Sequence, residues 1–212
     1  MRDFPVFTTE NGVGSLVLRE IPYRKVAYVT IRDSLLPDAF LSECVDFCRA
    51  VGAERIYACG HAILEKYPLY TTVVQMSGSI LSLEQTDACL FPVTEQTLGR
   101  WREIYNARMD KVDNASFLSE QAARELLGSG DAYFIHRDGD LLGIGKASGN
   151  RIDCIASVKP GSGWEIVSAL AHALLSDPIV LEVATTNTRA MQLYRAIGFI
   201  PTQEISRWYK II

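Results

Sequence analysis

Residues 179–199 read IVLEVATTNTRAMQLYRAIGF and describe a strand followed by a short helix. Apolar residues alternate with others along 179–183, which is the period of a strand with one buried face. In the helix that follows, Asn187 and Tyr194 fall two turns apart on the same face. Gly198 stands where a left-handed C-cap residue ends a helix. Polar groups on the inner face of a helix are costly unless they are paired or used, so this segment is the first candidate for a functional site.

The same stretch resembles the last sequence block of the GNAT acetyltransferase superfamily, where a strand precedes N-x-x-A-x-x-L-Y-x-x-x-G-F. The residues that match this pattern at every spacing are Asn187, Ala190, Leu193, Tyr194, Gly198 and Phe199. The resemblance implies an α/β fold with a GNAT-type mixed central sheet flanked by helices. A fold does not by itself establish a reaction, because one fold hosts many functions.

The periodicity along the chain predicts two parts, residues 1–88 and residues 89–212. In the second part the predicted order is β, α, α, β, β, β, α, β, α, β, which is the GNAT order. It includes a hairpin around Asp138-Gly139, since Asp-Gly favours a tight turn, and a helix from Gly163 to Leu175. The first part reads β-α-β-α-β from Val26 to Met76, and we expect it to be a smaller α/β part and a degenerate half-GNAT repeat.

Composition limits the classes of partner. The chain has 212 residues, of which 48% are hydrophobic, and a net charge of -4. We expect neither a nucleic-acid nor a membrane partner, because both favour a basic face and no apolar run approaches a membrane span. The first residues, MRDFPVFTTE, lack the apolar stretch of a signal peptide, and the cytoplasm is the expected compartment.

The cysteines do not form a metal or redox motif. There are five of them and three scattered histidines, with no C-x-x-C. Metal sites place cysteine and histidine ligands at short, regular spacing. We therefore expect no metal, and buried, reduced thiols with a structural role. The cysteines are Cys44, Cys48, Cys59, Cys89 and Cys154.

The GNAT resemblance implies acetyl-CoA as co-substrate and assigns candidate residues to it. The pantetheine arm is expected along the edge of the strand 151–158, at Ile155, Ser157 and Val158. The pyrophosphate is expected at the N-terminus of the next helix, where backbone amides and the helix dipole favour an anion. The loop residues expected there are Gly161, Ser162 and Gly163.

The resemblance also assigns roles in the last helix. Tyr194 is expected to protonate the leaving thiolate as general acid; the alternative is packing with a hydrogen-bonded hydroxyl. Asn187 is expected to position the CoA arm, and it is also among the best N-cap residues. Arg195 is expected near the CoA phosphates, although a solvated helix face explains it equally well.

The phosphate loop departs from the family pattern V-x-P-x-x-R/Q-x-x-G-x-G/A. Val158 and Pro160 fit, but the loop is one residue short, and Glu165 and Val167 fall on the two small-residue positions. Ser162 and Glu165 have the spacing of a capping box, in which both side chains would occupy the amides that pyrophosphate needs.

The resulting prediction is an N-acetyltransferase that moves an acetyl group directly from acetyl-CoA to a small amine or a peptide amine. The alternative is a non-catalytic GNAT-fold binding or interaction protein with a degenerate phosphate loop. Asp153 and Glu182, on neighbouring strands, are both candidates for the general base. The acceptor and the oligomeric state are not indicated by any motif.

Overall fold

The computed structural model describes residues 5–110, 112, 115–174 and 176–212. Leu175, the last residue of one predicted helix, and the first four residues lie outside this range. The chain forms two compact units: unit 1 contains the residues up to Val73 together with Glu204–Ile212, and unit 2 is Val74–Gln203. This division differs from the predicted boundary between residues 88 and 89, because Met76 and Leu83 are buried in the core of unit 2.

Two long strands contribute residues to both units. These are β5 (Leu69–Gly78) and β11 (Ile200–Lys210). In unit 1 the strand order is β1-β2-β3-β4-β11-β5, and in unit 2 it is β11-β5-β10-β9-β8-β7-β6. Each unit therefore completes its sheet with a strand from the other half of the sequence.

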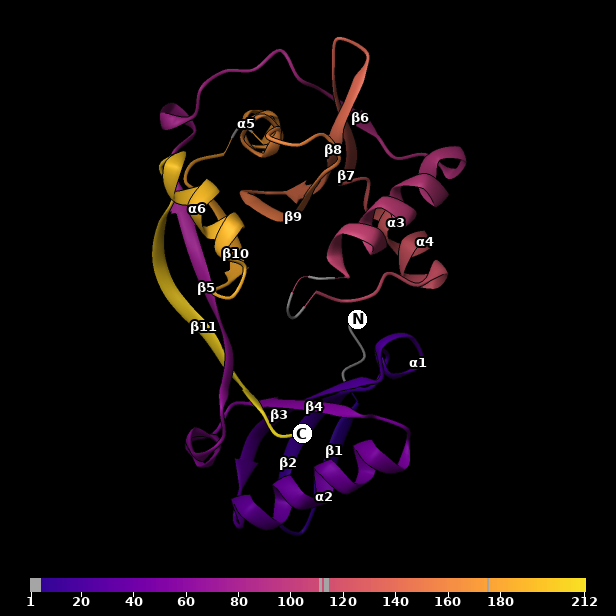
Figure 1. Ribbon diagram of the computed structural model, residues 1–212, viewed down its shortest axis with the longest axis vertical. Helices are drawn as coiled ribbons and strands as arrows, with labels where there is room; N and C mark the ends of the chain where they lie inside the picture. Colours follow the sequence, from indigo (N-terminus) through magenta and orange to yellow (C-terminus); the bar gives the residue numbers. More distant parts are fainter. Residues whose placement is uncertain (1–4, 111, 113–114, 175) are drawn as a thin grey trace. The chain divides into compact units, whose positions relative to one another are not determined.

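Unit 1 is a sheet with one long helix on one face (Figure 1). Strands β3 and β4 are parallel, and α2 connects them. The helix buries Phe40, Cys44 and Cys48 against the sheet, as its apolar stripe predicts. The elements are β1 Val6–Thr9, β2 Gly12–Val17, α1 Ile21–Arg24, β3 Val26–Ser34, α2 Pro37–Ala50, β4 Arg55–Cys59 and the 3₁₀ helix Ala62–Lys66.

Unit 2 contains the other elements. In chain order they are the 3₁₀ helix Ile80–Ser82, β6 Cys89–Pro92, α3 Glu95–Met109, α4 Glu120–Ser129, β7 Ala132–Arg137, β8 Asp140–Ser148, β9 Arg151–Ser157, α5 Gly163–Leu174, β10 Ile179–Ala184 and α6 Thr188–Ala196. Strands β6 to β9 pair antiparallel, whereas β9 and β10 are parallel.

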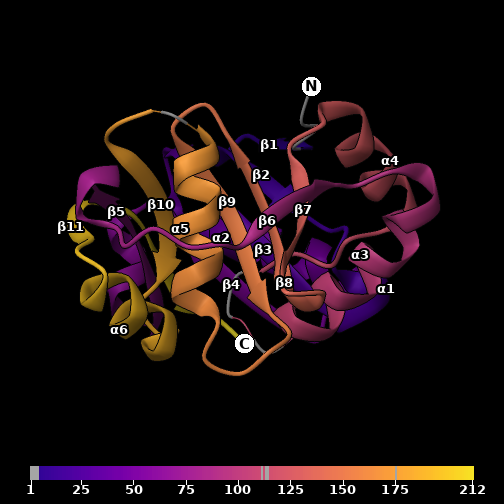
Figure 2. The same cartoon turned by 90° about the horizontal axis from the view of Figure 1, so that it is seen from above.

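The sheet of unit 2 is covered on both faces. Helix α5 crosses strands β8 and β9 (Figure 2) and buries Ile166 and Leu170 against Ile135, Leu142 and Ile152. Helix α3 packs on β8 and β9 through a separate core cluster that includes Trp101, Ile104, Ile144 and Ala156. Ile152 and Ala156 of β9 therefore belong to cores on opposite faces.

Most local predictions are confirmed. The order predicted for residues 89–212 is the observed one. At the β7–β8 turn Asp138 and Gly139 both have positive φ, 53° and 84°, as a tight hairpin turn requires. Gly198, with φ of 96°, follows the end of α6. Helix α4 ends at Ser129 and is followed by the C-cap residue Gly130, which has a left-handed φ of 68°.

The cysteines are free thiols, as expected. Cys44, Cys48 and Cys59 are buried, Cys154 is partly exposed, and Cys89 is exposed on β6, so the prediction of burial is wrong for Cys89. Cys89 lies on the edge strand of the unit 2 sheet, which has a neighbour on one side only. No helix of the described residues has the length and apolarity to cross a membrane.

Candidate active site

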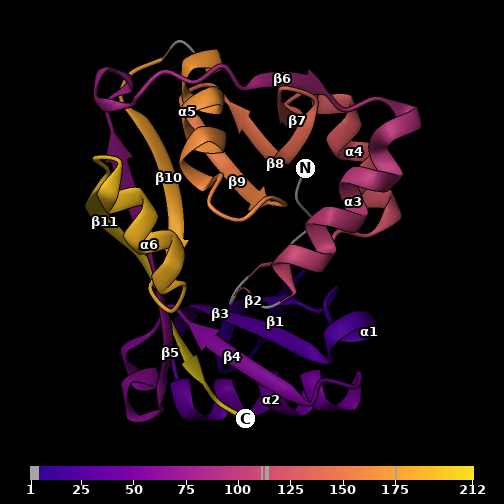
Figure 3. The same ribbon diagram turned by 45° about the horizontal axis from the view of Figure 1, so that its top comes forward.

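Strand β9 leaves its parallel neighbour after two residues. Arg151 pairs with Val180 and Ile152 with Leu181, and no further pairs join the two strands within the described residues. The two strands diverge from this start (Figure 3). The predicted pantetheine residues Ile155 and Ser157 lie on the diverging part of β9, where they pair only with Gly145 and Gly143 of β8. This edge can therefore accept an extended ligand as an added strand.

A β-bulge marks the point of divergence. The pairing between β8 and β9 skips Asp153, since Lys146 pairs with Cys154 and Ala147 with Ile152. An extra residue in one strand turns the side chains beyond it to the other face. The bulge explains why Ile152 and Ala156, four residues apart on one strand, reach different cores.

The loop after β9 forms a tight turn. The Ser162 amide donates to the carbonyl of Lys159 at 3.4 Å, and Pro160 and Gly161 occupy the two central positions. Gly161 has φ of 84°, a conformation that residues with a side chain rarely adopt. The amides of Val158 and Lys159 donate to Leu142 O at 2.8 and 3.0 Å. The amide of Val158 is therefore not free for a cofactor.

The predicted capping box does not form. Ser162, only 2% exposed, donates its hydroxyl to the carbonyl oxygens of Leu142 at 3.1 Å and Lys159 at 2.8 Å. The Glu165 carboxylate pairs instead with the guanidinium of Arg137 at the end of β7. Both side chains that were expected to cover the helix amides are thus engaged elsewhere.

The first turn of α5 consequently has open amides. Within the described part of the chain, the backbone N–H groups of Gly163, Trp164 and Glu165 have no hydrogen-bond partner. Unpaired N–H groups at a helix N-terminus, together with the helix dipole, form a site for an anion.

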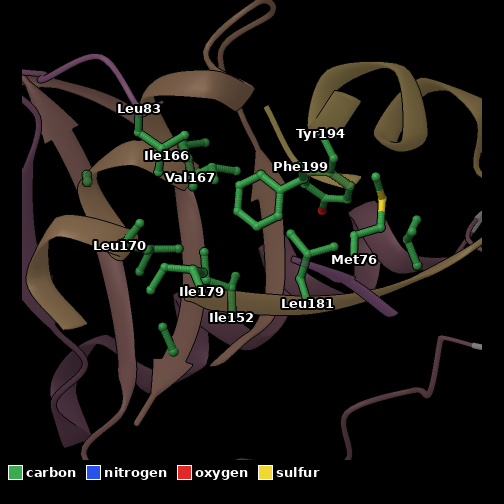
Figure 4. Close-up of a cluster of buried hydrophobic side chains, with 14 of the residues drawn as sticks. Met76, Leu83, Ile152, Ile166, Val167, Leu170, Ile179, Leu181, Tyr194 and Phe199 are labelled. Atoms are coloured by element: carbon green, nitrogen blue, oxygen red, sulfur yellow. The ribbon is translucent and has the colours of Figure 1, made fainter. Parts of the chain in front are cut away.

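Tyr194 lies in the core beside this turn. Its side chain belongs to the same hydrophobic cluster as Ile166 and Val167 of α5 and is 7% exposed. Figure 4 shows its ring next to Phe199, and the ring centroids are 6.1 Å apart. The Tyr194 hydroxyl has no hydrogen-bond partner among the described residues. The expected packing is therefore present. The hydroxyl is not among the fully buried side-chain atoms that lack a partner, so water can supply its hydrogen bond.

Burial raises the pKa of Tyr194 well above its usual value, and the Cys154 thiol adds to the shift. Burial likewise raises the pKa of Cys154 to about 12, so this thiol is not a nucleophile at neutral pH. Tyr194 therefore stays protonated at neutral pH, as a proton donor must.

The other predicted residues of α6 lie at its ends. Asn187 is the N-cap, and its side-chain oxygen accepts a hydrogen bond from the amide of Ala190 at 3.3 Å. This confirms the capping alternative and leaves the proposed contact with CoA as a prediction. Arg195 is exposed in the last turn.

Both candidate general bases are held in ion pairs. Asp153 Oδ2 lies 2.5 Å from Lys146 Nζ, and its Oδ1 lies 2.9 Å from Arg151 Nε. Arg151 also pairs with Glu182 at 2.9 Å. Partial burial favours a raised pKa for Asp153, but the hydrogen bond and charge of Lys146, followed by those of Arg151, outweigh it and lower the pKa. A carboxylate with a lowered pKa is a weak base.

Comparison of the structure with known proteins identifies the fold. A conserved protein of unknown function from Staphylococcus epidermidis superposes with a TM-score of 0.60 at 12% identity, over 99% of this chain and 94% of that one. A GNAT-family acetyltransferase from Colwellia psychrerythraea superposes with a TM-score of 0.53 at 12% identity, over 96% of this chain and 84% of that one. This chain has the GNAT fold.

A tandem GNAT protein from the clavulanic acid biosynthesis pathway is also similar, with a TM-score of 0.50 at 12% identity over 94% of this chain and 78% of that one. No protein-family model and no curated protein matches the sequence. At such low identity the GNAT likeness establishes the fold alone.

Two features of this GNAT fold had no signal in the sequence. The bulge at Asp153 depends on pairing with another strand, and the role of Arg137 depends on a contact with a residue 28 positions away. For the contact of Arg137, the local sequence indicates only the tight Asp138-Gly139 turn, which places Arg137 at the end of a strand.

Proposed function

We propose that the protein is an acyl-CoA-dependent N-acetyltransferase that transfers an acetyl group directly to an amine. The observation that carries this proposal is the set of open amides at Gly163, Trp164 and Glu165, in the turn that follows a strand with a free edge. A pyrophosphate accepts hydrogen bonds from such amides, and a pantetheine arm can extend along the strand from there.

The reaction needs one proton donor from the protein. The neutral amine attacks the thioester carbonyl, a C–N bond forms and the C–S bond breaks. Tyr194 gives its proton to the departing CoA thiolate, and the amine releases a proton to water. Asn187 positions the CoA arm, and Arg195 approaches the CoA phosphates from α6. The acceptor is a small amine or a peptide amine, and we place the reaction in the cytoplasm.

A calorimetric titration tests the proposal. We expect acetyl-CoA to bind with micromolar affinity, and S-acetylpantetheine, which lacks the pyrophosphate, to bind at least about tenfold more weakly. Free CoA released in the presence of a panel of amines then reports transfer. If millimolar acetyl-CoA produces neither heat nor a thermal shift, the proposal is wrong. If the two compounds bind equally, the open amides do not form the phosphate site.

A second candidate function is a GNAT-fold protein that binds acetyl-CoA without transferring its acetyl group. The ion pairs of Asp153 and Glu182 favour it, because neither carboxylate is free to accept a proton. Binding of acetyl-CoA without CoA release from any amine would support this candidate.

We further propose that residues 1–88 are a degenerate half-GNAT repeat. The β3–α2–β4 segment has the parallel arrangement of β9–α5–β10. The N-terminus of α2 differs from that of α5 in two ways: its first helical residue is Pro37, which has no N–H group, and the preceding amides of Leu35 and Leu36 both donate to Asn11 O, at 3.0 and 3.2 Å. Unit 1 therefore lacks the three consecutive open amides found at the start of α5.

A further inference from the structure

Glu165 stands in the first turn of α5, beside the open amides. Its side chain is 8% exposed, and its carboxylate forms an ion pair with Arg137, whose side chain is 36% exposed. Burial of an ionised carboxylate is costly unless a partner balances its charge. Among the described residues, Arg137 is the only cation that pairs with Glu165.

The β7–β8 turn contacts the phosphate loop at two points. Arg137 pairs with Glu165, and Asp140 pairs with Lys159 at 2.7 Å. The turn between them is tight, with Asp138 and Gly139 both in the left-handed region. Arg137 is therefore held by a short, rigid turn rather than by a flexible loop. Arg137 thus balances the charge of Glu165, and Lys159 that of Asp140, while the exposed Asp138 also lies 3.8 Å from Arg137.

The carboxylate of a glutamate at this helix position has a second possible hydrogen-bond partner, the backbone at the helix N-terminus. Glu165 lies three residues after the N-cap residue Ser162. Its carboxylate can turn back and accept a hydrogen bond from the Ser162 amide, as in a capping box, in place of the 3.4 Å bond from that amide to Lys159 O. In the structure the carboxylate pairs with Arg137 instead. Without Arg137, the carboxylate would be both uncompensated and free to cover the helix N-terminus.

We propose that Arg137 is a positioning residue of the acetyl-CoA site: it holds Glu165 away from the amides of the α5 N-terminus and neutralises its charge. This inference rests on the proposed function. It also explains how the loop can bind pyrophosphate with a glutamate where GNAT proteins have a small residue. Arg137 acts through Glu165 and not by direct contact with the phosphates.

A double-mutant cycle tests this role by calorimetry with acetyl-CoA. We expect Arg137→Met to weaken binding about tenfold or more, and Glu165→Ala to leave it unchanged or tighter. The double variant should bind within about threefold of Glu165→Ala alone, because Arg137 has no function once the carboxylate is gone. Arg100→Met is the matched control, since it makes the same substitution in an exposed pair with Glu103 on α3.

Amide hydrogen exchange of residues 162–165 in the free protein provides a second readout. If Glu165 folds back in Arg137→Met, exchange at these amides should slow by about threefold or more, and the double variant should restore the fast rate. A loss of packing alone would instead speed exchange. This readout does not depend on acetyl-CoA.

The outcomes separate the two proposals. If wild-type protein does not bind acetyl-CoA, the proposed function fails, while slower exchange in Arg137→Met would still support the positioning role. If wild-type protein binds, but Arg137→Met has no effect or has the same effect with and without Glu165, the positioning role is wrong and the proposed function stands. Unchanged or faster exchange in Arg137→Met also overturns it.

Discussion

A Cβ atom on Gly163 would lie 2.7 Å from Leu193 Cδ2. This is far shorter than an ordinary van der Waals contact, so the absence of a side chain at Gly163 allows the first turn of α5 to lie against α6. Tyr194 follows Leu193 directly. The same contact therefore sets the separation between the open amides and the proposed acid.

Gly163→Ala should disturb this contact. Leu193 must rotate or α6 must shift, and we expect a loss of about 1 kcal/mol in the free energy of unfolding, measured with urea. Weaker acetyl-CoA binding should accompany it. Gly128→Ala is the control, because nothing lies within 4 Å of its Cβ position in α4. That change should stabilise the protein by up to about 1 kcal/mol. An equal gain in the free energy of unfolding in both variants would show that a Cβ atom at residue 163 does not clash with Leu193.

Tyr194→Phe separates catalysis from packing. Because the hydroxyl has no hydrogen-bond partner in the described residues, its removal should leave the melting temperature unchanged or slightly higher. Turnover should fall about 10²-fold, with little change in acetyl-CoA affinity. The control is Tyr133→Phe, which removes a phenolic hydroxyl from β7. An unchanged rate would return Tyr194 to a packing role.

Asp153→Asn should destabilise the protein by roughly 1–2 kcal/mol at pH 7, because it breaks contacts with Lys146 and Arg151. The pKa of Asp153 is lowered in the folded state. Its stabilisation is therefore fully present above the unfolded-state pKa of about 4 and is lost as the pH falls through the lower folded-state pKa.

The gap in stability between wild type and Asp153→Asn should accordingly be constant from neutral pH down to about pH 5 and close at lower pH. Urea denaturation at a series of pH values measures it. Asp46→Asn, on the exposed face of α2, controls for the change in net charge. A gap that does not depend on pH would contradict the ion-pair assignment.

One molecule of acetyl-CoA should bind per chain. The amides of Leu35 and Leu36 before α2 are occupied by Asn11 O, and the first helical residue, Pro37, has no N–H group, so unit 1 lacks the three consecutive open amides of the α5 site. Isothermal titration measures the stoichiometry. A value of two would show that the half-repeat has kept a cofactor site. Asn11→Ala leaves the occupying carbonyl in place and should not change the count.

Local patterns in the sequence were sufficient for the order of elements in residues 89–212, because strand and helix periods, the Asp138-Gly139 turn and the cap at Asn187 act between near neighbours. The GNAT resemblance of residues 187–199 correctly indicated the fold for the same reason. Its signal lies in one strand, one helix and one turn.

Only the tertiary structure decided the state of the phosphate loop. Ser162-x-x-Glu165 is a capping box by sequence, but a hydroxyl and a carboxylate bind whichever partner the fold brings close. Here Leu142 and Arg137 come from other strands and take both side chains away from the helix. The amides remain open because these long-range contacts replace the local ones. The spacing of Ser162 and Glu165 in the sequence does not reveal which partner each side chain binds, since those partners are distant in the sequence.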